Sequence, residues 1–251
     1  ATVAGVLAFA LALRLPALNA GLWVDEIETL VAFTRLPVWE IPFALESQNN
    51  HVLYTLAAWL TTTVFGESAW ALRLPAVLFG VASVWAAYDF GTELGSRREG
   101  VLTALLMAAS SHHVFFSQSA RGYTALLFTA TLATTLFLRL LREGDRAGRG
   151  LRWGYPLLLL ATCMAHLTGG AVLAVHGAIG LFAWMRGRRE GRAVVVGTVT
   201  GAALIAHVVD RARADGAVTV YWTTAEDNAV ARRLYDRVAA KTEFIQYKIG
   251  L

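Results

Sequence analysis

Long apolar runs separated by short polar connectors dominate the chain. The runs cover residues 3–18, 69–94, 100–116, 124–141, 155–185 and 193–209. A helix needs about 20 apolar residues to cross a bilayer, with a working range of about 17 to 25. The pattern therefore predicts an all-α multi-pass bundle of about six or seven membrane helices.

A shorter apolar run at residues 51–65, "HVLYTLAAWLTTTVF", falls below the length that crosses a bilayer. Its larger apolar residues recur at helical spacing, opposite a row of threonines and an alanine. The apolar row is Val52, Leu53, Leu56, Trp59, Leu60 and Val64, and the other row is Thr55, Ala58, Thr61 and Thr62. This spacing is typical of an amphipathic helix that lies at the membrane interface.

Composition agrees with a membrane protein, since 56% of the 251 residues are hydrophobic and only 16% are charged. Soluble domains carry roughly 25% charged residues. The net charge of +4 arises from arginines in the connectors and not from one basic patch, which argues against nucleic-acid binding. Cys163 is the single cysteine, so a disulfide within the chain is excluded.

Arginine is concentrated in three connectors, at residues 95–100, 139–152 and 186–192. By the positive-inside rule all three face the cytoplasm, which requires an even number of crossings between them. Residues 100–141 then cross twice, and residues 153–185 form a tight pair that turns at "HLTGG". We therefore expect a protein of the cytoplasmic (plasma) membrane.

This orientation places most of the polar candidate residues on the extracytoplasmic side of the membrane. Residues 20–68 become one extracytoplasmic loop whose acids outnumber its single basic residue, Arg35. These acids are Asp25, Glu26, Glu28, Glu40, Glu46 and Glu67. The connector "SSHHVFFSQSARGY" and the turn at His166 reach the same side. We expect the active face to be this extracytoplasmic one.

Three stretches carry a family resemblance: "LWVDE", "NNHVLYTLAAWLTTTVFGESAWALRLPAVLFG" and "FSQSARGYTALLF". They resemble the N-terminal half of the GT-C membrane glycosyltransferases, in the protein-mannosyltransferase-like branch, over about residues 1–190. The resemblance implies transfer of a sugar from a polyprenyl-phosphate carrier to a lipid, glycan or protein acceptor outside the membrane. It also implies an enzyme shortened here on its C-terminal side.

The resemblance places the first-loop acid, Asp25 with Glu26 beside it, near the reacting centre. An acceptor hydroxyl needs a carboxylate as general base, and a departing phosphate needs cationic donors. We expect Asp25 to act as base or as ligand of a divalent metal, and Arg121 to bind the phosphate. Asp25 and Glu28 also fit a helix-capping box, which is the structural alternative.

Further substrate- or phosphate-binding candidates lie in the same connectors. They are Asn49, Asn50, His51, His112, His113, Tyr123 and His166. The asparagines and His51 are candidates for sugar hydroxyls, and the other histidines for the phosphate or a metal. As alternatives, His112 and His113 are interfacial residues at a helix end, and Arg121 is a boundary anchor. For His176, inside an apolar run, we expect a hydrogen-bonded core position.

The texture changes from about residue 203, where strand, helix and strand patterns predict a small α/β fragment. It resembles the last part of a GNAT acetyltransferase, in which Asn228 and Tyr235 match the cofactor-contacting asparagine and the general-acid tyrosine. Of that family's phosphate-binding loop, "VGTVTGAALI" retains Gly197 and Gly201. Acetyl-CoA is implied only for a complete domain.

Two domains follow, a membrane domain at residues 1–192 and a GNAT-like fragment at residues 193–251, with a seam at about residues 190–203. Residues 193–209 fit either a seventh crossing or the opening helix of the fragment. Besides the glycosyltransferase, a membrane-anchored acetyltransferase and a non-catalytic membrane fragment remain alternatives.

Overall fold

The computed structural model describes residues 2–44, 47 and 49–214. The helices are α1 (Thr2–Arg14), α2 (Val24–Glu28), α3 (Val52–Phe65), α4 (Ala69–Leu94), α5 (Arg97–Ala109), α6 (Ser111–Ser117), α7 (Tyr123–Glu143), α8 (Arg149–Ala165), α9 (Gly169–Met185) and α10 (Arg189–Ala214). A π-helical turn, Thr29–Phe33, continues α2. This part of the chain contains no strand. The predicted α/β fragment from residue 215 onward, with Asn228 and Tyr235, lies outside the described residues.

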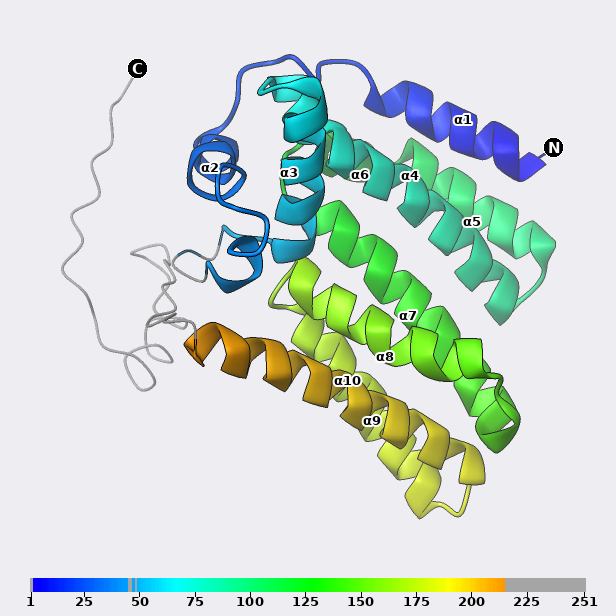
Figure 1. The fold of residues 1–251 in the computed structure, drawn as a ribbon. Helices are drawn as coiled ribbons and strands as arrows, with labels where there is room; N and C mark the ends of the chain where they lie inside the picture. Colours follow the sequence, from blue (N-terminus) through cyan, green and yellow to red (C-terminus); the bar gives the residue numbers. More distant parts are fainter. Residues whose placement is uncertain (1, 45–46, 48, 215–251) are drawn as a thin grey trace, which may run out of the picture.

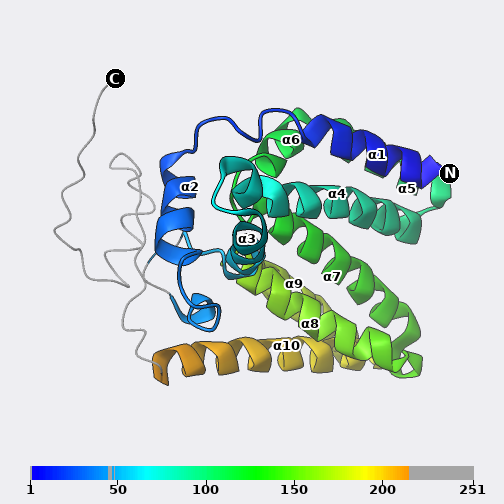
Figure 2. The same cartoon turned by 45° about the horizontal axis from the view of Figure 1, so that its top comes forward.

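The long helices run side by side in alternating directions, with α2 and α3 across one end (Figures 1 and 2). We call this the loop end; it also holds the connector 118–122 and the turn 166–168. The connectors 95–96, 144–148 and 186–188 lie together at the opposite, arginine end. The helices thus alternate in direction and bring all three arginine-rich connectors to one end, as the arginine pattern requires.

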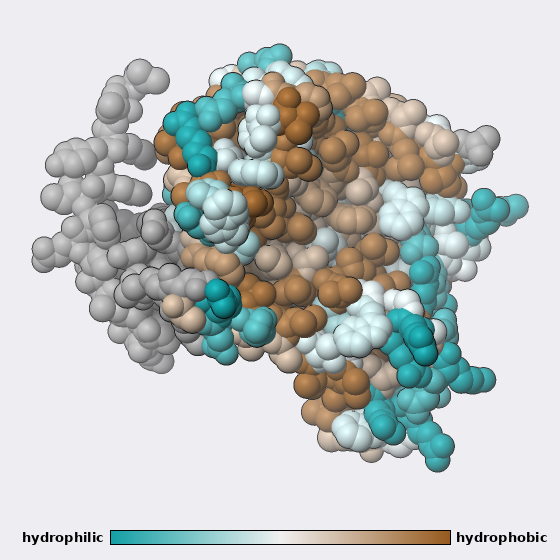
Figure 3. Space-filling view, viewed as in Figure 1, coloured by the Kyte–Doolittle hydropathy of each residue, from teal (hydrophilic) through white to brown (hydrophobic). Residues whose placement is uncertain are grey.

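The bundle has the surface of an integral membrane protein. Within the described residues, Ala69–Leu94, Tyr123–Arg146 and Arg189–Arg211 are long and apolar enough to cross a bilayer. Figure 3 shows apolar side chains over the middle of the bundle and hydrophilic ones at the arginine end. Together with the bent pair α5 and α6, up to four spans meet the criterion. The expected total of six or seven remains a prediction, because α1 and α9 are shorter.

The apolar run at residues 100–116 does not form the straight helix expected from its hydropathy. It breaks at Ser110 into α5 and α6, whose axes differ by 65°. The Ser110 backbone is extended, and its hydroxyl accepts a hydrogen bond from the His113 amide, which caps α6. A serine at this position therefore ends one helix and starts the next.

The C-terminal half of α3 turns its apolar residues outward, although Val52 at the start of the helix is buried. Leu60 and Val64 are 55% and 62% exposed, whereas Thr55, Ala58 and Thr62 are buried toward the bundle. A water-soluble amphipathic helix would show the reverse arrangement. Lipid contact for the apolar row and close packing for the small row account for it.

Helix α10 packs into the bundle as a regular element. The Tyr155 hydroxyl lies 3.2 Å from His176 Nδ1 and 3.1 Å from Thr198 Oγ1, and thus joins α8, α9 and α10. His176 is the hydrogen-bonded core residue expected from the sequence. A Cβ on Gly197 would come within 2.6 Å of Tyr155, and one on Gly201 within 3.2 Å of Leu159. These glycines therefore serve helix packing in mid-helix, and the expected remnant of a phosphate-binding loop is wrong.

Candidate functional site

Five sequence candidates from separate elements meet at the loop end. Asp25 lies on α2, His51 precedes α3, Arg121 and Tyr123 flank the start of α7, and His166 ends α8. The rings of His51 and His166 stack with centroids 5.0 Å apart, and Tyr123 lies 5.6 Å from His166. We call these five residues the loop-end site.

An ion pair between Asp25 and Arg121 closes the outer edge of this site. The Asp25 side chain is 56% exposed and that of Arg121 is 20% exposed. The Arg121 guanidinium also lies over the Tyr123 ring and donates to the Tyr123 hydroxyl at 3.3 Å. Its buried Nε has no hydrogen-bond partner among the described residues. The arginine is thus held in place with a free donor, while the carboxylate stays open to a substrate.

Glu26, next to Asp25, is enclosed and fully paired. Its Oε1 accepts from Arg73 Nε at 2.9 Å and from the Ala120 amide at 2.6 Å. Its Oε2 accepts from Arg73 NH2 at 2.6 Å and from the Trp23 amide at 2.9 Å. Burial by itself raises the carboxyl pKa, but these hydrogen bonds, led by Arg73, bring it below its ordinary value. Glu26 thus ties α2 to α4 and to the residue before Arg121.

The capping of α2 differs from the box expected for Asp25 and Glu28. Trp23 is the N-cap residue, and the acid that reaches back to its amide is Glu26. Asp25 has no capping hydrogen bond, because its carboxylate points to Arg121. Its side chain is therefore available for another role.

Arg73 is a further residue that forms the site and was not predicted, although its position in an apolar run is a signal for it. An arginine within an apolar run faces the interior of a bundle and finds a partner there. The remaining donors of Arg73 bind the carbonyls of Leu18, Ala20 and Gly21 at 3.0, 2.8 and 2.9 Å. This arginine consequently holds the segment that leads from α1 into α2.

Burial and nearby charge keep His51 neutral. Desolvation, followed by the charges of Arg121 and His166, lowers its pKa to about 3. The ring forms a hydrogen bond with the Ala165 backbone, and its buried Nε2 has no partner. Burial and the Arg121 charge also lower the pKa of His166. The site thus presents neutral imidazoles beside one cation.

Two asparagines before His51 each leave an acceptor unpaired. The Asn49 amide donates to the Asp25 carbonyl at 2.6 Å, and the Asn50 amide donates to the carbonyls of Ile41 and Ala44 at 2.9 and 2.8 Å. The Oδ1 atom of each asparagine is buried without a partner. Buried polar groups are normally hydrogen-bonded, so these oxygens are candidates for ligand hydroxyls.

Gly122 lets the connectors of the loop-end site approach each other. A Cβ there would lie 2.4 Å from the Ala165 carbonyl oxygen and 2.7 Å from His51 Cβ. Real Cβ atoms essentially never come that close. The step from Arg121 to Tyr123 therefore requires glycine.

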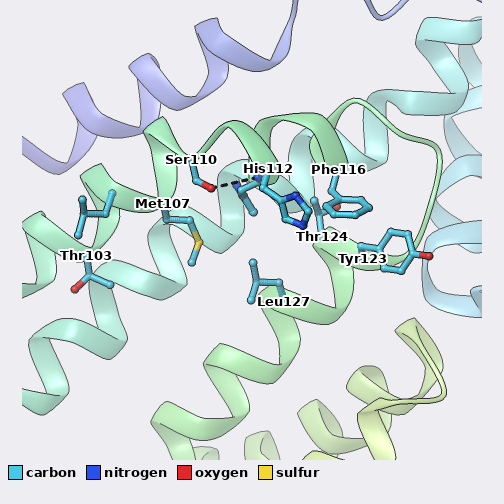
Figure 4. A pocket seen from close by; sticks show the side chains of 10 residues that line it. Thr103, Met107, Ser110, His112, Phe116, Tyr123, Thr124 and Leu127 are labelled. Carbon is cyan, nitrogen blue, oxygen red and sulfur yellow. Dashed lines mark hydrogen bonds between the residues drawn. The ribbon is translucent and has the colours of Figure 1, made fainter.

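His112 and His113 lie apart from the five residues of the loop-end site, at a neighbouring pocket of about 440 Å³ between α5, α6 and α7 (Figure 4). The exposed His112 packs edge-on against Phe116, and Phe116 packs against Tyr123. Tyr123 lines the pocket as well, so it joins the two regions. Over the described part of the chain, His, Cys, Asp and Glu form no group of three or more suited to a metal ion.

Comparison with known families identifies the class of protein. Residues 51–209 match the family model of dolichyl-phosphate-mannose-protein mannosyltransferase. A short second match, to the GNAT acetyltransferase family, covers residues 200–239. No individual curated protein matches the chain. Since the first match spans more than half of the sequence, the chain belongs to the dolichyl-phosphate-mannose-protein mannosyltransferase family and is a membrane glycosyltransferase of the GT-C type.

Proposed function

We propose that the loop-end site transfers a sugar from a polyprenyl-phosphate carrier to an acceptor hydroxyl on the extracytoplasmic side of the plasma membrane. The Asp25–Arg121 pair carries the proposal, because it sets an open carboxylate beside a held guanidinium. The family name refers to a dolichyl-phosphate-mannose donor, which supports the class of carrier. The arginine end faces the cytoplasm in this assignment, as the positive-inside rule requires.

In the chemical step the acceptor oxygen attacks the anomeric carbon of the sugar. The bond from that carbon to the phosphate oxygen breaks, and its electron pair leaves with the phosphate. Asp25 removes the proton of the acceptor hydroxyl. Arg121, with the Tyr123 hydroxyl beside it, stabilises the charge on the departing phosphate.

The ion pair also gives Asp25 a partner before the donor binds. Without donor, Asp25 and Arg121 neutralise each other. A donor phosphate competes for the guanidinium, since arginine binds phosphate and carboxylate with the same donor geometry. Donor binding thereby releases Asp25 to accept a proton.

Unpaired acceptors at the loop end form the sugar subsite in this proposal. Asn50 Oδ1 and His51 Nε2 are buried without partners and accept hydroxyl donors from the sugar. Since His51 is neutral, its Nε2 lone pair is available for such a bond at physiological pH. His166, stacked on His51, fixes the ring plane.

The packing of α10 supports a later end of the membrane domain than the expected residue 192. We place the end of the membrane domain after Gly201, because residues up to this glycine pack on α8. The acetyltransferase match begins at residue 200, and most of it lies outside the described residues. The glycosyltransferase site draws on no residue of that segment.

The test is transfer by the full chain in membrane vesicles, with polyprenyl-phosphate mannose as donor and release of polyprenyl phosphate as readout. Asp25→Asn should lower the rate by about 10²- to 10⁴-fold, the usual contribution of a general base. Glu28→Gln, a neighbouring acid on the same helix, is the matched control and should retain the rate. An active Asp25→Asn protein would refute the assigned role.

A further inference from the structure

Arg14 is an unusual cation, buried completely and without an acid beside it. Its guanidinium donates to Ser117 Oγ at 3.1 Å, to the Ala10 carbonyl at 2.7 Å and to the Ala108 carbonyl at 3.3 Å. Among the ion pairs of the described residues, none includes Arg14. A buried charge of this kind normally has a counter-ion. Carbonyl and hydroxyl dipoles, and not a carboxylate, therefore face its charge.

The fourth partner of Arg14 is His113, whose Nδ1 lies 2.6 Å from the guanidinium NH2. A guanidinium can only donate hydrogen bonds, so His113 Nδ1 must accept. The neutral ring then carries its proton on Nε2. Arg14 thus determines the tautomer of His113 and makes Nε2 a donor.

This donor has no partner among the residues that the structure describes. His113 is 8% exposed, and its Nε2 is buried without a hydrogen bond. An unpaired buried donor is costly, and few native groups remain in that state. His113 is one of the residues that line the pocket between α5, α6 and α7, so a ligand in this pocket lies beside the ring that carries this donor.

The rest of the pocket lining indicates the chemistry of that ligand. Met107, Leu127 and Tyr123 line the pocket (Figure 4), and Leu106 adds to its apolar wall. The Tyr123 ring also contacts the Arg121 guanidinium. Leu106 is 66% exposed on the lipid-facing surface, so a lipid chain can enter sideways. The volume of about 440 Å³ lies within the usual range for ligand pockets, about 300–1,000 Å³. The pocket therefore offers a hydrogen-bond donor to an anionic head group and an apolar wall to a lipid tail.

We propose that this pocket binds the isoprenoid carrier next to its phosphate, with His113 Nε2–H as the buried donor to the phosphate and Arg14 as the residue that positions that proton. The proposal rests on the proposed function for the identity of the carrier. The phosphate lies between His113 and the Tyr123–Arg121 edge of the site. The first isoprene units lie against Leu106, Met107 and Leu127.

The test measures binding of farnesyl monophosphate to the full chain in lipid nanodiscs, with farnesol as the uncharged comparison. His113→Asn keeps an acceptor for Arg14 at the Nδ1 position and removes the donor at Nε2. We expect unchanged thermal stability, an affinity for farnesyl monophosphate at least about tenfold lower, and unchanged farnesol binding. His207→Asn, an exposed histidine of α10, is the matched control and should bind like the unsubstituted chain.

Equal affinity of His113→Asn and the unsubstituted chain for farnesyl monophosphate would overturn the proposal, as would absence of saturable binding. If the variant does not fold, labelling of the unsubstituted chain with a photoreactive farnesyl phosphate tests the location of the binding site instead. Labelling should fall between residues 103 and 127, and labelling elsewhere contradicts the pocket. The binding measurement involves no sugar transfer and no acceptor, so a failure of the catalytic assignment is distinguishable from a failure of this one.

Discussion

Replacing Glu26 by glutamine tests whether the buried pair holds the loop end together. The substitution keeps the size of the side chain and removes its charge, which leaves Arg73 buried without a counter-ion. The two side chains are only 2% and 3% exposed. Breaking a buried pair from one side costs about 3–5 kcal/mol. We expect a loss of that order in the free energy of unfolding.

The chain provides a matched control in the pair Arg35–Glu67. This pair has the same bidentate geometry, with distances of 3.0 and 2.8 Å, but its side chains are 53% and 46% exposed. Exposed pairs contribute about 0–1 kcal/mol. Glu67→Gln should therefore leave the unfolding temperature in detergent nearly unchanged, whereas Glu26→Gln should lower it by roughly 6–20 °C.

The pH dependence provides a second readout of the same pair. The Glu26 pKa is depressed in the folded protein below its ordinary value of 4.5. Its contribution to stability is therefore present above pH 4.5 and lost as the pH falls through the folded pKa. Glu26→Gln should lack this acid-induced loss. Equal destabilisation by Glu26→Gln and Glu67→Gln would refute the reasoning. So would a Glu26→Gln protein that loses as much stability at low pH as the unsubstituted chain.

Three further substitutions or titrations test other parts of the structure. Gly122→Ala should strongly reduce transfer, because its Cβ would meet the Ala165 carbonyl oxygen at 2.4 Å; the rate in membrane vesicles checks this. Gly197→Ala should cost about 1–3 kcal/mol by overpacking against Tyr155, measured as thermal unfolding in detergent, whereas Gly170→Ala, with open space around it, should not destabilise. Titration with acetyl-CoA should show no saturable binding, because the family match covers only residues 200–239; saturable binding would support the acetyltransferase alternative.

Hydropathy by itself determined the class of this protein. The apolar runs predicted a membrane bundle, because a bilayer core admits only segments whose backbone groups are paired internally. Arginine counting also placed the three connectors at one end, since the number of helices between them has to be even. Local motifs also predicted Asp25, His51 and Arg121 as site residues. Hydropathy, arginine counts and short motifs are properties of the sequence alone, so they do not depend on how the helices pack.

Tertiary structure decided which partners surround each of these residues. Asp25 and Glu26 are neighbours in the sequence with equal charge, yet Asp25 faces an open site and Glu26 is enclosed by Arg73, Ala120 and Trp23. The tautomer of His113 depends on Arg14, which is 99 residues distant in the sequence. Partners so far apart are brought together only by packing, because periodicity describes the face of a helix and not the helix it meets.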